Sequence, residues 1–149
     1  MEAAPLLQEI LKQLVSSQRL GVLVTQGGGQ PYGSLVAFVA TDDLKQLIFA
    51  TARSTRKYAN LSGEPRVAMV IDNRSNRESD FHKAIAATAT GVVKEVEGIE
   101  KDRLLDLYLS KHPYLKDFAQ SPTSALLRLD VEVYYVVSRF QNVMELHIK

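Results

Sequence analysis

Residues 48–61, IFATARSTRKYANL, begin with the composition of a buried strand and end with that of a helix. Ser54 and Thr55, at the change, are residue types that commonly cap a helix. A helix N-terminus has unpaired N–H groups and a partial positive charge, and Arg56 and Lys57 add two cations there. The stretch therefore predicts a strand–turn–helix unit. Its turn is either a binding site for an anion such as phosphate or an ordinary capped turn in solvent.

Stretches with the composition of β-strands lie on both sides of this unit. They are residues 20–26, 32–41, 45–51, 66–72, 81–97 and 125–148, of which the last is long enough for one or two strands. The first two are separated by GGGQP, whose glycines can take the positive φ angles of a hairpin turn. Because short turns join most of the segments, we expect a largely antiparallel sheet, and closure into a small barrel would remove its exposed edges.

Helices are predicted at the periphery of this sheet. Helical periodicity or capping signals occur at residues 5–18, 54–63, 98–112 and 113–120. The polar segment 73–80 predicts a loop. The sequence thus predicts one domain, residues 1–149, of the mostly β class with peripheral helices and roughly five to seven strands.

The composition limits the classes of function. With 149 residues, 46% of them hydrophobic, the chain can bury a core of its own. The formal charge of +1 gives no reason to expect nucleic acid or an acidic membrane as a partner. Cysteine is absent and His82, His112 and His147 lie far apart, so we expect no metal site. The N-terminus does not resemble a signal peptide and no apolar run approaches the ~20 residues of a membrane span, which predicts a cytoplasmic protein.

The order of the motifs resembles the FMN-binding split-barrel family, whose best-known member is pyridoxamine 5′-phosphate oxidase. The resemblance covers residues 18–95 and rests on GQPY at 29–32, the strand GSLVAFV at 33–39, and LIFATARSTRKYANLSGEPRVAMVI at 47–71. It implies an antiparallel split β-barrel that forms a homodimer with FMN at the interface. It also implies flavin-mediated hydride or electron transfer with a small-molecule substrate.

The resemblance further implies a set of cofactor-binding residues. They are Ser34, Leu35, Val36, Ala50 and Thr51 along the flavin; Thr55, Arg56 and Lys57 at the FMN phosphate; and Asn73, Ser75 and Phe140, from segments 72–75 and 139–141, at the flavin of the other subunit.

Two departures argue against a pyridoxamine phosphate oxidase proper. Ser34 stands where that enzyme has an arginine, and the C-terminal end, VSRFQNVMELHIK, lacks its W-x-x-Q-R-L-like segment. We therefore expect an FMN-dependent oxidoreductase of another activity, with an unknown substrate and unknown catalytic residues, and with NAD(P)H as one candidate electron donor. The alternatives are an FMN carrier or sensor without turnover and a barrel that binds the deazaflavin F420. Haem-degrading relatives use a C-terminal histidine, but the resemblance does not extend to His147.

Overall fold

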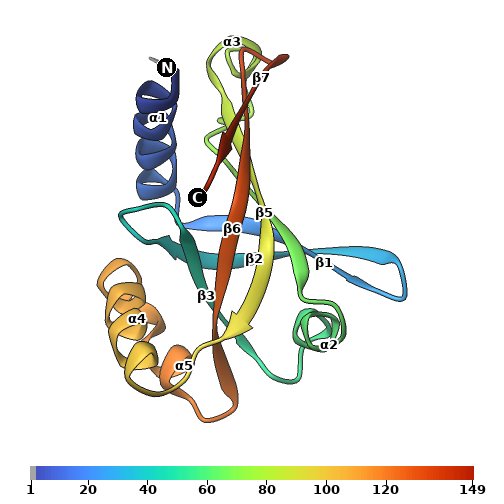
Figure 1. The fold of residues 1–149 in the computed structure, drawn as a ribbon, viewed down its shortest axis with the longest axis vertical. Coiled ribbons are helices and arrows are strands. Elements are labelled where there is room, and N and C mark those ends of the chain that lie inside the picture. The colour runs from blue at the N-terminus through green and yellow to red at the C-terminus, as the bar shows by residue number, and fades with distance from the viewer. Residues whose placement is uncertain (1–2) are drawn as a thin grey trace.

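The computed structural model describes residues 3–149, which form a β-barrel surrounded by short helices (Figure 1). The strands are β1 (Leu20–Gly27), β2 (Gln30–Ala40), β3 (Gln46–Ala52), β4 (Arg66–Asp72), β5 (Ile85–Glu95), β6 (Ser124–Ser138) and β7 (Asn142–His147). The helices are α1 (Ala3–Ser17), α2 (Arg56–Gly63), α3 (Asp80–Lys83), α4 (Gly98–Lys111), the 3₁₀ turn η1 (Pro113–Leu115) and α5 (Lys116–Gln120).

The strands of residues 3–149 form one sheet in which every neighbouring pair is antiparallel. The order is β3-β2-β1-β4-β5-β6-β7, and an additional pairing of β3 with β6 closes six strands into a barrel. β6 can make this closure because it is 15 residues long: its residues from Leu127 onward pair with β5, its first half pairs with β3 and its second half with β7. The predicted antiparallel barrel with peripheral helices is confirmed, and β7 is left outside the barrel.

The segment before β5 differs from the prediction. The sequence predicts one strand over residues 81–97, but Asp80–Lys83 forms the short helix α3 and the strand begins only at Ile85. The Asp80 carboxylate accepts a hydrogen bond from the backbone N–H of Ser75 at 2.9 Å, and such local bonds favour a turn over an extended strand. The predicted strand was therefore wrong at its first residues, because the prediction rested on composition, which does not reveal this side-chain network.

The β1–β2 and β6–β7 hairpins both turn through residues with positive φ angles. Gly28 and Gly29 take positive φ angles of 58° and 83° between β1 and β2, which confirms the predicted glycine hairpin. Arg139 and Phe140 take φ angles of 49° and 71°, and this turn divides residues 125–148 into the two strands β6 and β7.

The sheet is packed on both of its sides. The barrel interior holds large apolar side chains, and α1 and α2 pack against it through Leu11 and Leu61. Outside the barrel, α4 and α5 pack on β2, β3 and β6, where Ile48 and Tyr108 are buried. Figure 1 shows α4 and α5 together at one end of the molecule and α3 with the β6–β7 hairpin at the other. None of the helices formed by residues 3–149 is long and apolar enough to cross a bilayer.

Candidate functional site

The turn from β3 to α2 is built by two threonines. Thr55 is the N-cap of α2, with extended backbone (φ −83°, ψ 156°), and its Oγ1 accepts a hydrogen bond from Tyr58 N at 3.3 Å. The same Oγ1 lies 2.9 Å from Ala52 O, to which it donates, and 3.0 Å from Thr51 Oγ1. Of the two caps that the sequence allows, the structure selects Thr55, and it places a second hydroxyl directly beside it.

Two cations follow this turn, and their charge is not compensated by a carboxylate. Within residues 6–149, neither Arg56 nor Lys57 has a carboxylate oxygen within 4 Å. Arg56 is exposed, with its guanidinium carbon 6.0 Å from the centre of the Tyr32 ring, while Lys57 is half-buried. The first N–H groups of α2 add a partial positive charge at the same place. The turn is therefore a site of local positive charge in a nearly neutral protein.

A pocket of about 340 Å³ opens beside this turn. Its polar end consists of Thr51, Thr55 and Lys57. The rest of the wall is mostly apolar and comes from β1, β2, β3, α4 and the η1–α5 segment: Leu20, Leu35, Val36, Ala37, Ala50, Ala52, Tyr108, Leu115 and Phe118. The pocket therefore combines an anion-attracting end with an apolar surface.

Six of the residues predicted from the sequence line this one pocket: Leu35, Val36, Ala50, Thr51, Thr55 and Lys57. The apolar wall contributed by Tyr108, Leu115 and Phe118 was not predicted from the sequence. The periodicity of segment 98–112 indicates an inward face, but periodicity carries no information about which strands that face covers.

Two further predicted residues lie close to this pocket in sequence but do not line it. Arg56 is next to Lys57 and points to Tyr32. Ser34 pairs with Leu23, a fully buried residue of the barrel interior, and its Oγ is buried without a hydrogen-bond partner in residues 3–149. A buried hydroxyl without a partner is uncommon, because its desolvation is not compensated.

The residues expected to reach a partner's flavin are engaged locally within this chain. Asn73 Oδ1 accepts a hydrogen bond from Ile85 N at 2.7 Å. Ser75 Oγ donates to Asp80 Oδ1 at 2.8 Å. Phe140 packs edge-on against Phe81, with ring centroids 5.3 Å apart. All three lie near α3 and the β6–β7 hairpin, away from α2 (Figure 1), so their role at a cofactor stays a prediction that requires a second subunit.

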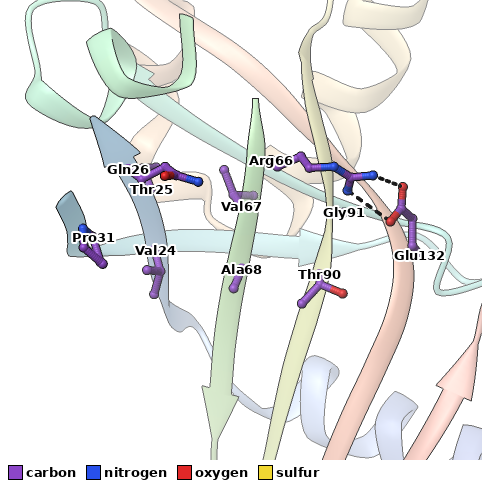
Figure 2. A pocket seen from close by; sticks show the side chains of 10 residues that line it. All are labelled: Val24, Thr25, Gln26, Pro31, Arg66, Val67, Ala68, Thr90, Gly91 and Glu132. Atoms are coloured by element: carbon purple, nitrogen blue, oxygen red, sulfur yellow. Dashed lines mark hydrogen bonds and ion pairs between the residues drawn. The ribbon is translucent and has the colours of Figure 1, made fainter. Parts of the chain in front are cut away.

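A different pocket, of about 380 Å³, lies on the outer face of β1, β4 and β5 (Figure 2). Its cation, Arg66, reaches across Gly91 and forms a bidentate ion pair with Glu132 at 3.2 and 3.4 Å. Because that charge is already compensated, this pocket is less suited to an anion than the pocket beside α2.

The titratable side chains that line the α2 pocket are Lys57 and Tyr108. Burial raises the pKa of Tyr108 to about 12, so its hydroxyl, which donates to Ala37 O at 3.3 Å, keeps its proton at neutral pH. Tyr108 is therefore a structural group in this wall and is not poised to transfer protons near pH 7.

The histidines are dispersed in the structure as they are in the sequence. Among residues 3–149, no three His, Asp or Glu side chains converge in a way that could hold a metal ion. His112 is buried, with Nε2 2.7 Å from Phe38 O, and burial lowers its pKa. His147 is exposed on β7, with Nε2 2.9 Å from Glu145 Oε1.

The closed antiparallel barrel and the strand–turn–helix unit at the rim of a pocket define a split β-barrel protein. The family model described as pyridoxamine 5′-phosphate oxidase matches residues 7–138, and the chain belongs to this family. No curated protein sequence is significantly similar to the chain.

Solved structures with the same fold include proteins that are described as binding different ligands. A haem-binding protein from Mycobacterium smegmatis has a TM-score of 0.84 at 18% identity; the match covers 94% of this chain but only 57% of that one. An FAD-binding protein from Mesorhizobium loti has a TM-score of 0.71 at 18% identity, over 86% and 90% of the two chains. General Stress Protein 26 from Bacillus anthracis has a TM-score of 0.71 at 21% identity, over 95% and 98%. At these identities the similarity establishes the fold.

Proposed function

We propose that the protein binds FMN in the pocket beside α2 and acts as an FMN-dependent oxidoreductase. The observation that carries this proposal is the division of the pocket into a polar end, at Thr51, Thr55 and Lys57, and an apolar remainder. FMN has the same division, with a phosphate at one end and a planar ring system at the other. The family match and the fold shared with a protein described as FAD-binding support a flavin.

The side chains present fit the phosphate of FMN. The first turn of α2 offers N–H groups, and Lys57 with its neighbour Arg56 offers uncompensated positive charge. The hydroxyls of Thr51 and Thr55, which bond to each other and to Ala52 O, hold the turn in shape. Each charge-assisted hydrogen bond to such a group contributes roughly 1.5–3 kcal/mol. Bound FMN would supply hydride or electron transfer, while the chain's residues bind it, orient it and exclude water.

The flavin ring would lie against the apolar part of the pocket. Leu35, Val36 and Ala50 line that part, and Leu35 keeps 66% of its surface exposed, which is high for a leucine that no ligand or subunit covers.

The proposal includes a homodimer with the flavin between the subunits. Val22 and Val24 on β1, with Ala68 and Val70 on β4, form a half-buried apolar row on the outer face of the barrel. A second subunit on this face would cover apolar surface. The family resemblance implies that such a partner supplies contacts to the flavin, from the partner's Asn73, the partner's Ser75 and the partner's Phe140.

The first test is the visible spectrum of the purified protein, followed by FMN titration. We expect a flavin spectrum or FMN uptake, and at least tenfold weaker FMN binding in the double variant Arg56→Ala/Lys57→Ala, since about 1.4 kcal/mol corresponds to tenfold. Lys45→Ala/Lys94→Ala removes the same charge from two exposed lysines outside the pocket and should leave the affinity near that of the wild type. A wild type without a flavin spectrum and without FMN affinity refutes the proposal.

Anaerobic mixing of the FMN-loaded protein with NADH or NADPH separates an oxidoreductase from a carrier or sensor. Bleaching of the flavin absorbance supports NAD(P)H as the electron donor and turnover as the function. Absence of bleaching with both donors favours the carrier. Competitive titration with FMN and F420 decides between the flavin and the deazaflavin.

A second candidate ligand is haem. A protein described as haem-binding shares the fold over 94% of this chain, and His147 presents an exposed imidazole on β7, next to Val133 of β6. Haemin titration with His147→Ala as control tests this candidate. A Soret shift that depends on His147, together with no FMN affinity, would replace the flavin proposal.

A further inference from the structure

Three side chains beside the β3–α2 turn, the proposed phosphate site, form a triangle of hydrogen bonds. Arg53 binds Glu95 with both of its terminal nitrogens, at 3.0 and 2.7 Å. Arg53 Nη1 also donates to Tyr58 Oη at 2.8 Å, and Tyr58 Oη donates to Glu95 Oε1 at 2.8 Å. Bidentate, charge-assisted geometry of this kind fixes the relative orientation of its members.

The triangle joins the two ends of the turn to a third element of the barrel. Arg53 directly follows β3, Tyr58 is in the first turn of α2, and Glu95 is the last residue of β5. Residues 54–57 lie between Arg53 and Tyr58 and include the proposed phosphate ligands. Arg53 N also donates to Thr123 O at 2.9 Å, and Tyr58 N donates to Thr55 Oγ1 at 3.3 Å. Backbone and side-chain bonds therefore hold the turn at both ends.

The triangle also separates the positive charges near the turn into two groups. Glu95 compensates Arg53, and the Arg53 guanidinium holds the pKa of the Glu95 carboxyl below its usual range. Arg56 and Lys57 have no such partner within residues 6–149, as shown above. Arg53 is thus committed to structure, and the other two cations are the ones available to an anion.

We propose that Arg53, Tyr58 and Glu95 form a positioning network that holds residues 54–57 in the geometry that binds the phosphate of FMN. The inference rests on the proposed function and deepens it, because none of the three lines the pocket. The network acts on the first N–H groups of α2, which Thr55 caps, and on Lys57, whose donors must converge on one phosphate.

The experiment compares FMN with riboflavin, which lacks the phosphate, in fluorescence titrations of the wild type, Tyr58→Phe and Glu95→Gln. We expect both variants to bind FMN about tenfold more weakly, the equivalent of one charge-assisted hydrogen bond, with riboflavin affinity nearly unchanged. Tyr58→Phe removes one hydroxyl and no charge. Glu95→Gln releases the charge of Arg53, so a purely electrostatic effect would strengthen FMN binding. Unchanged or stronger FMN binding in both variants overturns the proposal.

Glu100→Gln is the matched control, because it breaks another arginine–glutamate ion pair, between Glu100 of α4 and Arg128 of β6, neither of which lines the α2 pocket or the outer-face pocket. Its ratio of FMN to riboflavin affinity should equal that of the wild type. A ratio lowered as much as in Glu95→Gln would indicate a general loss of stability and would overturn the proposal.

Amide hydrogen exchange in the ligand-free protein tests the network independently of FMN. We expect faster exchange at residues 54–58 in Tyr58→Phe than in the wild type or Glu100→Gln. If the wild type binds no FMN, the proposed function fails while this readout still judges whether the network orders the turn. If exchange at residues 54–58 is unchanged, the positioning role fails even where FMN binds.

Discussion

Among the glycines of the chain's described residues, Gly91 has the least room for a side chain. It lies at the bulge where the register of β5 and β6 shifts, and a Cβ placed there would lie 2.0 Å from Asp130 O, a backbone atom. We predict that Gly91→Ala lowers the free energy of unfolding by roughly 2–4 kcal/mol, because backbone must move to accommodate the methyl group.

Gly33→Ala is the matched control for this prediction. A Cβ at Gly33 would meet Val22 Cγ1 at 3.6 Å, an ordinary van der Waals contact. The control should therefore change the unfolding free energy by less than about 1 kcal/mol. Urea denaturation measures both variants, and equal losses would show that close approach at Gly91 is not the cause.

Residues of the candidate site could be predicted from the sequence where the signal was local. Thr55 caps α2 because cap, turn and helix follow one another in the chain. Ser34 illustrates the opposite case, since its position depends on the register with Leu23 on β1 and its hydroxyl faces no partner within the described chain. Leu115 and Phe118 depend on how α5 docks, which one sequence does not encode in any local pattern.

At the scale of elements, the packing of α4 on the barrel depends on a buried tyrosine. Tyr108 is 1% exposed, and burial raises its pKa to about 12, whereas an unfolded tyrosine ionises near pH 10. Its contribution to stability is therefore complete below pH 10 and is lost as the pH rises from about 10 to 12. We predict that the unfolding free energy of Tyr108→Phe falls less steeply over this range than that of the wild type, by up to about 2–3 kcal/mol.

Urea denaturation at pH 8 to 12 checks this prediction, and parallel curves for the two proteins would contradict it. The comparison must be made as a difference because other groups also titrate. Burial raises the pKa of Tyr134 as well, which adds to the loss at high pH. Burial lowers the pKa of Lys111 to about 8, which acts in the opposite sense above that pH. Both contributions remain in the variant and cancel in the difference.

The order of elements was predictable because each strand and most helices have their own composition and periodicity. The exception is α3, which forms where the Asp80 carboxylate accepts hydrogen bonds from the backbone N–H groups of residues 75–77. This network depends on the geometry of a few neighbouring residues and not on their composition. The hairpin at Gly28 and Gly29 was predictable because positive φ is a property of the residue type.

At the scale of the whole molecule, the barrel leaves one apolar face that its own helices do not cover. α1 and α2 pack against the barrel interior, and α4 and α5 cover β2 and β3, whereas the outer face of β1, β4 and β5 stays partly exposed. Closure into a barrel was expected because it removes exposed sheet edges, and the family resemblance implied it as well. The pairing of β3 with β6 that makes the closure was not predicted, since composition does not reveal which strands pair at long range.

We predict that this face forms the homodimer and that dimerisation is required for tight FMN binding. Ala68 lies at its centre, paired with Val24 on one side and Thr90 on the other. Ala68→Arg would bury an unpaired charge in the interface and should weaken dimerisation by at least about 100-fold. The wild type should have twice the 16.6 kDa mass of one chain, while the variant should be a folded monomer with weak FMN affinity.

Ser110→Arg, which places the same side chain at an exposed position of α4, should remain dimeric and bind FMN normally. Analytical ultracentrifugation with FMN titration distinguishes the outcomes. A wild-type monomer that binds FMN tightly would mean that the flavin pocket is complete within one chain, and the partner contacts at Asn73 and Phe140 would then have no role.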